Sequence, residues 1–493
     1  MMRPNSTREA LGRCFRLLSA AVCAILLSGT ECAHSEGPGP SITVVDIIPV
    51  ALSGETDTNA EPDLTVSSVN PLEIAASVWV PEPLGGSTTP IFVSVDGGKT
   101  WSCRSTFPFQ QETCDKTIRF GGLSDMLYVA TLRNDDCALV VCRSGQLAIN
   151  LMAPVENKPI DVDQPFAAAA MINNQDRVFI GCLNFNGPPQ RTDTVVRSLD
   201  GAGNPPSDFT PVPIEFDKPL MDSSEVRPAI SGDGNKVYAV FNRVISKNGN
   251  KRVGDVILVR DDDGGNSGAA SFTALRDRNG VAGFPVVKAR TFFFDTDNFP
   301  ALLGRDRLGG DLAIAIDPRK ADRVYLVWGD VIEGHPALHV IRSDNGGTKW
   351  SGNLCTVKKA KNPGLAVTTN GTLGFLYQQV VKSEGGEETW ITNLERTKDD
   401  FRNVDTRTLA RFPVTEVKLD NGQPQLGDYL RLMAAGNAFY GIFPASNVPD
   451  LSRFCCGVTF QRLHDFTRHK LLDQDGKEVD PSIDPFFVMA PGL

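Results

Sequence analysis

Short apolar runs separated by polar, Gly- and Pro-containing segments recur along most of this chain. A typical unit starts with an acidic residue, continues into an apolar run, and has a second run around a Val-Tyr or Val-Phe pair. One unit, for example, opens at Glu225, continues through residues 226–230, and has residues 236–240 as its second run. Runs of this length between turn residues predict β-strands, and few long amphipathic runs predict helices.

The strand units recur often enough to predict a repeat architecture. A strong or weak unit opens at each of these positions: Asp63, Leu127, Asp163, Glu225, Asp311, Pro363 and Gly427. A lone four-stranded sheet cannot bury both of its faces, so neighbouring units must stack on one another. The sequence therefore predicts an all-β propeller of four-stranded blades. Seven blades are favoured, and six follow if the weak unit at Leu127 is an insertion.

One turn has a specific pattern. Residues 94–101 follow a strand-like run and read S-x-D-x-G-x-x-W, with Ser94, Asp96, Gly98 and Trp101 at the defining positions. The Asp carboxylate can accept hydrogen bonds from backbone N–H groups of its own loop, and Gly adopts positive φ without steric cost. The Trp ring can then pack back onto the sheet.

Looser copies of this turn follow other predicted strands. The best of them has Ser343, Asp344, Gly346 and Trp350, with one extra residue before the Trp. Copies at Asp200 and at residues 260–265 keep the Asp and Gly but lose the Trp. Between the copies, the Pro- and Phe-rich residues 276–307 are expected to form a long loop between blades.

The chain is acidic, with 49 Lys and Arg against 59 Asp and Glu, a formal net charge of -10. This balance argues against nucleic-acid binding, which needs basic groups to neutralise phosphates. We expect a monomer.

The N-terminus has four arginines followed by an apolar core, which predicts a signal peptide over residues 1–35 and a secreted or periplasmic protein. Cys32 raises a lipoprotein alternative, but Glu31 stands where a lipid-attachment motif needs a small residue. No other run is long enough to span a membrane. A polar segment, residues 36–61, is expected before a single propeller domain, residues 62–493.

Eight cysteines lie beyond the predicted signal peptide, an even number that permits full pairing in an oxidising compartment. Cys103 and Cys114 flank a Pro-containing loop and are the expected local bridge. No Cys-x-x-Cys pair is present, so a zinc site is not expected. Asp261 and Asp263 could contribute to a calcium site, but a turn explains them better, and no metal or cofactor is expected.

Acidic residues at the heads of first strands are the main candidates for chemistry. The first strand of each blade lines a propeller's channel, so these acids are expected around one mouth: Asp63, Asp163, Glu225, Asp311 and Asp428. Arg227, Arg431 and Tyr429 lie beside them in sequence. Such a ring could bind a sugar, a cation or a basic peptide, and clustered carboxyls raise one another's pKa. The alternative is that the acids bind backbone amides and lock the blades together.

The S-x-D-x-G-x-x-W turns resemble the Asp-box, or bacterial neuraminidase repeat, of sialidase-type β-propellers. The resemblance implies a glycan- or protein-binding propeller, or a glycosidase acting on sialosides or other acidic sugars. Family sialidases hold the substrate carboxylate with three arginines and use a Tyr–Glu nucleophile and an Asp acid/base. Here no arginine lies between Arg16 and Arg104, so the family's first arginine motif is missing. This departure favours a non-catalytic binding propeller.

If the chain is an enzyme, we expect Asp163, Glu225 or Asp428 as acid/base and Tyr429 as nucleophile. Arg227 or Arg431 would then hold the anion, with Asp63 and Asp311 as further ligand contacts.

Overall fold

The computed structural model describes residues 41–79, 90–104, 113–122, 126–133, 139–145, 161–185, 192–215, 225–293, 308–382, 385–416 and 426–493. These residues belong to one compact unit, Pro40–Leu493. The predicted signal peptide lies outside the described residues. In the described part of the chain, no helix is long and apolar enough to cross a membrane.

Six sheets follow one another along the chain, and neighbouring strands in each are antiparallel. The first contains β2 (Ala60–Val66), β3 (Ile74–Trp79), β4 (Ile91–Ser94) and β5 (Ser102–Cys103). The second contains β6 (Thr113–Phe120), β7 (Met126–Arg133) and β8 (Leu139–Gly145). The third contains β9 (Val162–Ile172), β10 (Gln175–Asn184), β11 (Thr192–Ser198) and β12 (Thr210–Pro213).

The next three sheets have four strands each. The fourth contains β13 (Val226–Ile230), β14 (Val237–Asn248), β15 (Lys251–Asp261) and β16 (Phe284–Phe293). The fifth contains β17 (Leu312–Ile316), β18 (Val324–Ile332), β19 (His335–Ser343) and β20 (Cys355–Lys358). The sixth contains β21 (Ala360–Val367), β22 (Leu373–Lys382), β23 (Glu388–Thr397) and β24 (Asp405–Pro413).

The seventh sheet combines both ends of the described chain. Its order is β25 (Arg431–Ala435), β26 (Ala438–Ser446), β31 (Ile483–Pro491), β1 (Thr43–Asp46) and β27 (Thr459–Phe460). A small additional sheet contains β28 (His464–Asp465), β29 (Lys470–Leu472) and β30 (Glu478–Val479). Three short 3-10 helices complete the described elements: η1 (Val50–Leu52), η2 (Gly268–Ala270) and η3 (Leu451–Arg453).

Two of the sequence expectations about these segments differ from the structure. The predicted N-terminal segment, residues 36–61, contributes β1 to the seventh sheet, because the apolar residues Val44 and Val45 are buried there. Residues 276–307, expected as a loop, contain β16, whose Pro285 is tolerated because β16 is the edge strand of its sheet.

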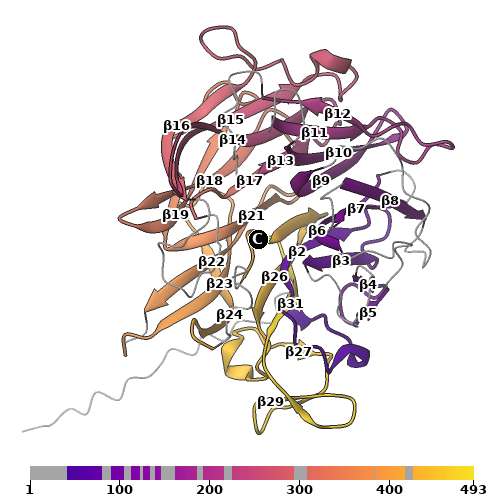
Figure 1. Ribbon diagram of the computed structural model, residues 1–493, viewed down its shortest axis with the longest axis vertical. Coiled ribbons are helices and arrows are strands. Elements are labelled where there is room, and N and C mark those ends of the chain that lie inside the picture. The colour runs from indigo at the N-terminus through magenta and orange to yellow at the C-terminus, as the bar shows by residue number, and fades with distance from the viewer. Residues whose placement is uncertain are drawn as a thin grey trace, which may run out of the picture. The chain divides into compact units, whose positions relative to one another are not determined.

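The first strands of the seven sheets contact one another in a closed cycle: β2, β6, β9, β13, β17, β21, β25 and β2 again. Figure 1 shows these strands around the middle of the described unit, with the outer strands of each sheet radiating from them. This is the all-β propeller arrangement that the strand units predict. The cycle contains seven sheets.

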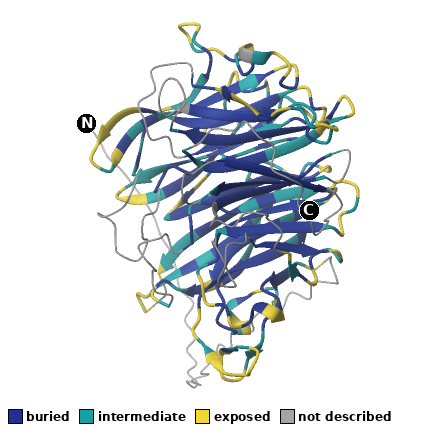
Figure 2. Cartoon of the chain, turned by 45° about the vertical axis from the view of Figure 1, so that its right-hand side comes forward, coloured by how far each residue is buried: buried dark blue, intermediate teal, exposed yellow. Residues whose placement is uncertain are grey.

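The core lies between stacked sheets. In β14 the run from Val237 to Phe241 is buried at every position, because both faces of its sheet are covered by neighbours. Separate apolar clusters join adjacent sheets; one packs Phe179 and Val195 of the third sheet against Val237 of the fourth. Figure 2 shows the consequence: buried residues follow the strands, and exposed residues gather in the connections.

The antiparallel order gives the unit two distinct sides. First strands begin on one side, which we call the entry face, and third strands end on the opposite side, the turn face. The predicted acids therefore lie at the entry face, whereas the S-x-D-x-G-x-x-W turn between β4 and β5 lies at the turn face.

The turn between β4 and β5 is closed by its own side chains. The Gly98 N–H donates to Ser94 Oγ at 2.9 Å, and the Thr100 N–H donates to Asp96 Oδ1 at 2.9 Å. The Trp101 Nε1–H donates to the Gly98 carbonyl at 3.0 Å, and the Trp101 ring packs on Phe487 of the seventh sheet. We call this arrangement the capped turn.

The second predicted copy has a different register. Asn345 Oδ1 accepts the Lys349 N–H at 2.9 Å, and the Gly347 N–H donates to Ser343 Oγ at 2.9 Å. Asn345 and Gly347 therefore take the positions assigned in the sequence to Asp344 and Gly346. The true spacing is S-x-N-x-G-x-x-W, with no extra residue before Trp350, whose Nε1–H donates to the Gly347 carbonyl at 3.0 Å.

Capped turns also connect the third and fourth strands of two other sheets. In the fourth sheet, Asp261 and Asp263 accept the N–H groups of Gly265 and Asn266 at 2.7 and 2.8 Å. In the sixth sheet, the Phe401 N–H donates to Thr397 Oγ1 at 3.2 Å and the Asn403 N–H to Asp399 Oδ1 at 2.8 Å. The sequence analysis missed this copy, because Thr and Phe replace Ser and Gly.

At Asp200, where a copy was expected, the turn closes differently. The Asp200 N–H donates to Ser207 Oγ at 2.7 Å.

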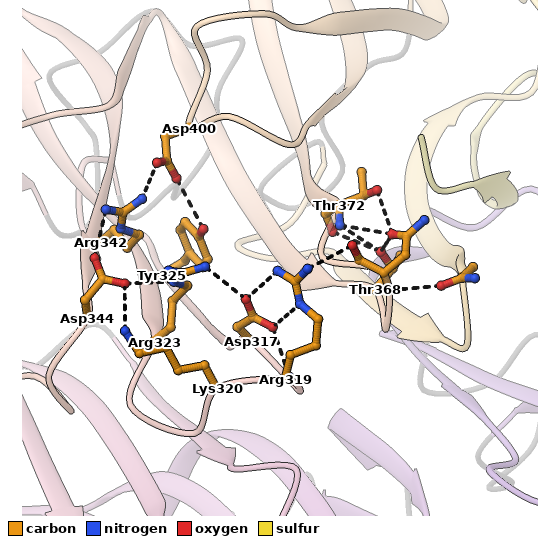
Figure 3. Close-up of polar contacts among 12 residues, drawn as sticks. Asp317, Arg319, Lys320, Arg323, Tyr325, Arg342, Asp344, Thr368, Thr372 and Asp400 are labelled. Atoms are coloured by element: carbon orange, nitrogen blue, oxygen red, sulfur yellow. Dashed lines mark hydrogen bonds and ion pairs between the residues drawn. The ribbon is translucent and has the colours of Figure 1, made fainter.

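Neighbouring sheets are tied at the turn face by an ion-pair network (Figure 3). Asp344 pairs with Arg323 and Arg342, each at 2.8 Å. Arg342 continues the network to Asp400 of the sixth sheet. Arg342 therefore links the fifth and sixth sheets, and Asp344, which does not cap its turn, pairs with Arg342 within the fifth sheet.

The predicted Cys103–Cys114 bridge is not formed. Cys103 carries a free thiol, as do Cys182, Cys355, Cys455 and Cys456.

Candidate ligand-binding site

A cavity of about 70 Å³ lies among the first strands of five sheets. Phe166 of β9, Arg227 of β13, Leu312 of β17, Pro363 of β21 and Arg431 of β25 all line it. Since these five strands belong to the closed cycle, the cavity lies in the central channel.

Five of the predicted site residues line this one cavity: Glu225, Arg227, Asp428, Tyr429 and Arg431. They come from only two segments, the starts of the fourth and seventh sheets. The closed cycle brings the segments together, because both first strands start on the entry face.

Phe166 organises the cationic groups of the cavity. The guanidinium carbons of Arg227 and Arg431 each lie 4.0 Å from the centre of the Phe166 ring, and that of Arg119 lies 5.8 Å away. The Tyr429 ring meets the Phe166 ring edge to face at 6.3 Å. Attraction between a guanidinium and an aromatic face partly replaces lost hydration, so Phe166 helps to hold two cations side by side.

Arg227 donates a hydrogen bond to Glu225 in a buried pair, whose side chains are 4% and 5% exposed. Among the described residues, Glu225 Oε1 and Arg227 Nη1 have no hydrogen-bond partner. Burial raises the pKa of Glu225 to about 8, although the charge of Arg227 acts in the opposite direction. At neutral pH the Glu225 carboxyl is therefore largely protonated and can donate a hydrogen bond.

Tyr429 is buried, and its hydroxyl also lacks a hydrogen-bond partner within the described part of the chain. Burial raises the pKa of Tyr429 well above its ordinary value, and the nearby carboxylates of Asp115 and Glu61 raise it further. The side chain is thus a neutral phenol, able to donate to a ligand and unable to act as a nucleophile without a base.

Asp63 is fully occupied by protein contacts. Its carboxylate accepts hydrogen bonds from Thr117 Oγ1 at 2.6 Å and from the Ile118 N–H at 3.1 Å, and pairs with Arg119 at 3.1 Å. All three partners lie on β6, so Asp63 ties the first sheet to the second. This is the role that the alternative prediction gives to the strand-head acids.

Asp311 makes a similar tie between the fifth and sixth sheets. Its Oδ1 accepts the Asn362 N–H at 2.8 Å, whereas Oδ2 has no hydrogen-bond partner in the described residues. Burial raises the pKa of Asp311, opposed by the charge of Lys361.

Gln164 contacts both Asp163 and Asp428 through hydrogen bonds. Asp163 Oδ1 accepts the N–H of Gln164, and Gln164 Nε2 donates to Asp428 Oδ2 at 3.1 Å. The Asp428 N–H in turn donates to Glu61 Oε1 at 3.0 Å. Asp428, which precedes the seventh sheet, therefore contacts both the third sheet and the first.

Sequence reasoning missed Phe166, Gln164 and Glu61. In the sequence Phe166 belongs to an apolar run and has no sign of a polar role. Its contact with arginines is seen only in the folded chain. Gln164 has φ of +47°, uncommon for a residue other than Gly, but a sequence gives no sign of it.

Asp261 and Asp263 are the residues that the sequence offers as possible calcium ligands. In the structure, one carboxylate oxygen of each accepts a backbone N–H of the same turn. In the parts of the chain that the structure describes, no group of three His, Cys, Asp or Glu side chains is arranged to hold a metal ion.

No protein-family model and no curated protein matches this chain. Solved structures similar to it include the GH74 enzyme of Niastella koreensis, at 13% identity over 80% of this chain and 64% of that chain, with a TM-score of 0.37. The chain thus spans less than two thirds of that enzyme's length. Sqt1 of Chaetomium thermophilum is 11% identical over 82% of each chain, with a TM-score of 0.40.

A further similar structure is a PL25 polysaccharide lyase, an ulvan lyase solved with -[GlcA(1-4)Rha3S]- bound. It is 10% identical over 79% of this chain and 92% of that chain, with a TM-score of 0.45. At these identities and scores the likenesses carry no argument about what this chain binds.

Proposed function

We propose that this chain is an exported binding propeller that recognises an acidic sugar of a glycan at its central cavity. The observation that carries the proposal is a set of three polar atoms without a hydrogen-bond partner among the described residues, all on residues that line one cavity: Arg227 Nη1, Glu225 Oε1 and the Tyr429 hydroxyl. Buried polar groups are normally paired, so groups like these are candidates for pairing with a ligand.

The types of group favour an anion with neighbouring hydroxyls. Arg227 would donate to a carboxylate of the sugar, with Arg431 adding positive charge from the other segment. A protonated Glu225 and the Tyr429 phenol would donate to carboxylate or hydroxyl oxygens. Asp428 would accept a sugar hydroxyl.

The size of the cavity favours binding over hydrolysis. Its volume of about 70 Å³ is far below the ~300 Å³ at which pockets begin to enclose a whole small ligand. One charged group of a sugar would enter, while the rest of the glycan stays outside. A glycosidase must instead surround the sugar ring at its reacting carbon.

The second candidate is a hydrolase of the sialidase type, the family that the capped turns resemble. The observation in its favour is a carboxyl whose pKa of about 8 suits a general acid, lining the same cavity as a tyrosine. Glu225 would protonate the leaving group, and Tyr429 would attack once a neighbouring carboxylate removed its proton.

Titration calorimetry with sialyllactose, and with lactose as the neutral match, tests the first proposal. We expect binding of sialyllactose alone, weakened by added salt. Equal affinity for both sugars, or none for either in folded protein, would reject acidic-sugar recognition and favour a protein ligand. A fluorogenic sialoside tests the second candidate: turnover lost in Glu225→Gln would establish a hydrolase.

A further inference from the structure

Two adjacent cysteines lie at the surface, and neither of them lines the cavity of the proposed function. Cys455 and Cys456 follow η3, in the connection between β26 and β27, and their Sγ atoms lie 2.8 Å apart. Cys455 is exposed and Cys456 is half-buried. No motif of the predicted propeller repeat requires this pair.

The segment that carries the thiols is held firmly on one side. Phe454 is buried, and its ring packs on Phe486 at 5.2 Å. Arg453 pairs with Glu416, and the Asp450 carboxylate caps η3 by accepting the Ser452 N–H at 3.0 Å. The two sulfurs are therefore kept close to each other while solvent reaches them.

The two thiols are chemically different. The hydrogen bond from Cys455, together with the charges of Arg407 and Arg396, lowers the pKa of Cys456 to about 7 against the opposing effect of burial. The same hydrogen bond raises the pKa of Cys455. One sulfur is thus partly a thiolate at neutral pH, the form that attacks disulfides, and the other remains a thiol beside it.

We propose that Cys455 and Cys456 form a redox-active dithiol that exchanges with an external disulfide and closes to an intramolecular disulfide. In the first step the Cys456 thiolate attacks one sulfur of the external disulfide, forms a mixed disulfide, and releases one thiolate. Cys455 then loses its proton and attacks Cys456 Sγ, which releases the second thiolate. The protein dithiol is oxidised by two electrons and loses two protons, and the external disulfide is reduced to two thiols.

The chain allows a clean readout of this reaction. Trypsin cleavage after Arg453 and Arg462 releases residues 454–462, in which Cys455 and Cys456 are the sole cysteines. The full chain is incubated with oxidised glutathione, quenched in acid, alkylated and digested. We expect the wild-type peptide to lose the mass of two hydrogens and to carry neither glutathione nor an alkyl group.

Single variants separate the two steps. Cys455→Ser should accumulate a stable glutathione adduct on Cys456, because no second thiol resolves it. Cys456→Ser should form its adduct on Cys455 about tenfold more slowly, because the attacking sulfur is then a poorer thiolate.

Two half-buried thiols serve as internal controls. Burial raises the pKa of Cys103 to about 11 and of Cys355 to about 12, so both should stay unmodified. Near-ultraviolet circular dichroism checks that each variant is folded. The proposal is overturned if the wild-type peptide is recovered with two alkylated thiols, or with two separate adducts, under conditions that modify Cys455→Ser.

Discussion

The two faces of this propeller place carboxyl groups in different surroundings. At the turn face, carboxylates are paired: Asp399 has a lowered pKa because Asn403 donates to it, and Asp344 has a lowered pKa because its arginine pairs outweigh burial. At the entry face, burial raises the pKa of Glu225 and Asp311. The position of an acid at the end of a strand therefore predicts the face of the propeller on which it lies. Its contacts in the fold determine whether it stabilises the fold or can bind a ligand.

The largest expected effect tests whether the turn face is structural. A Cβ at Gly98 would lie 2.1 Å from Phe487 Cε1, and φ at Gly98 is +86°. We expect Gly98→Ala to lower the free energy of unfolding by about 4 kcal/mol, since both a clash and backbone strain are introduced. Urea denaturation measures the change.

Gly97 is the matched control. Its φ is +77°, but the nearest atom to a Cβ there is Leu72 Cδ2 at 3.4 Å. Gly97→Ala should therefore cost only about 1 kcal/mol, from the strained backbone. An equal loss in both variants would show that close packing on the seventh sheet is unimportant.

An effect of similar size tests the raised pKa at the entry face. The Glu225 carboxyl titrates near 4.5 when unfolded and near 8 when folded. Between these values the folded chain holds the extra proton, so this group's contribution to stability is fully present below about pH 4.5 and is lost as pH rises through 8. We expect a fall of about 4 to 5 kcal/mol across this window, since each pKa unit corresponds to about 1.4 kcal/mol.

Glu225→Gln should remove this fall in urea titrations repeated from pH 5 to 9. Asp344→Asn, at the turn face, should leave it unchanged, because the lowered pKa of Asp344 places its titration below the window. An unchanged pH profile in Glu225→Gln would show that this carboxyl is ionised throughout.

The next effect concerns ligand affinity rather than stability. Arg227→Met should weaken sialyllactose binding about 30-fold, the loss expected for a charge-assisted hydrogen bond to a carboxylate. Arg319→Met is the matched control, because Arg319 pairs with Asp317 at the turn face. Equal affinities of the two variants for sialyllactose would show that Arg227 does not contact the ligand.

The smallest effect tests the register of the second capped turn. Asn345→Ala removes the acceptor of the Lys349 N–H and should cost about 1 kcal/mol. Asp344→Ala breaks only half-exposed ion pairs and should cost less than about 0.5 kcal/mol. Thermal denaturation measures the loss of stability in each variant. A larger loss in Asp344→Ala than in Asn345→Ala would show that Asp344 caps the turn.

Local patterns predicted much of this fold, because strands and turns are decided within a few residues. The run around Val237, for example, forms the predicted second strand. The sequence predicts Asp344 as the capping residue, whereas the structure has Asn345 in this role. Both side chains can accept the hydrogen bonds of a turn, and the position of Ser343 Oγ in the fold decides between them. β1 was missed because its partner, β31, lies at the other end of the sequence.

The candidate site was partly predictable for the same reason. A strand-head acid can be recognised one unit at a time, and five predicted residues share the cavity. Contacts with neighbouring sheets determine which acids can bind a ligand. Asp63 accepts hydrogen bonds from β6, whereas Glu225 has one oxygen without a partner among the described residues. Phe166 shows the limit most clearly, since its arginine partners come from three other sheets.

The pairing of β1 with β31 also sets the order in which the protein can fold. During synthesis β1 emerges long before β31, so the seventh sheet stays incomplete until residues 483–491 have emerged. Until then β1 and β26 present open edges to other nascent chains. The ring should close in a late, slow step, and a chain truncated before Ile483 should aggregate rather than form a smaller propeller.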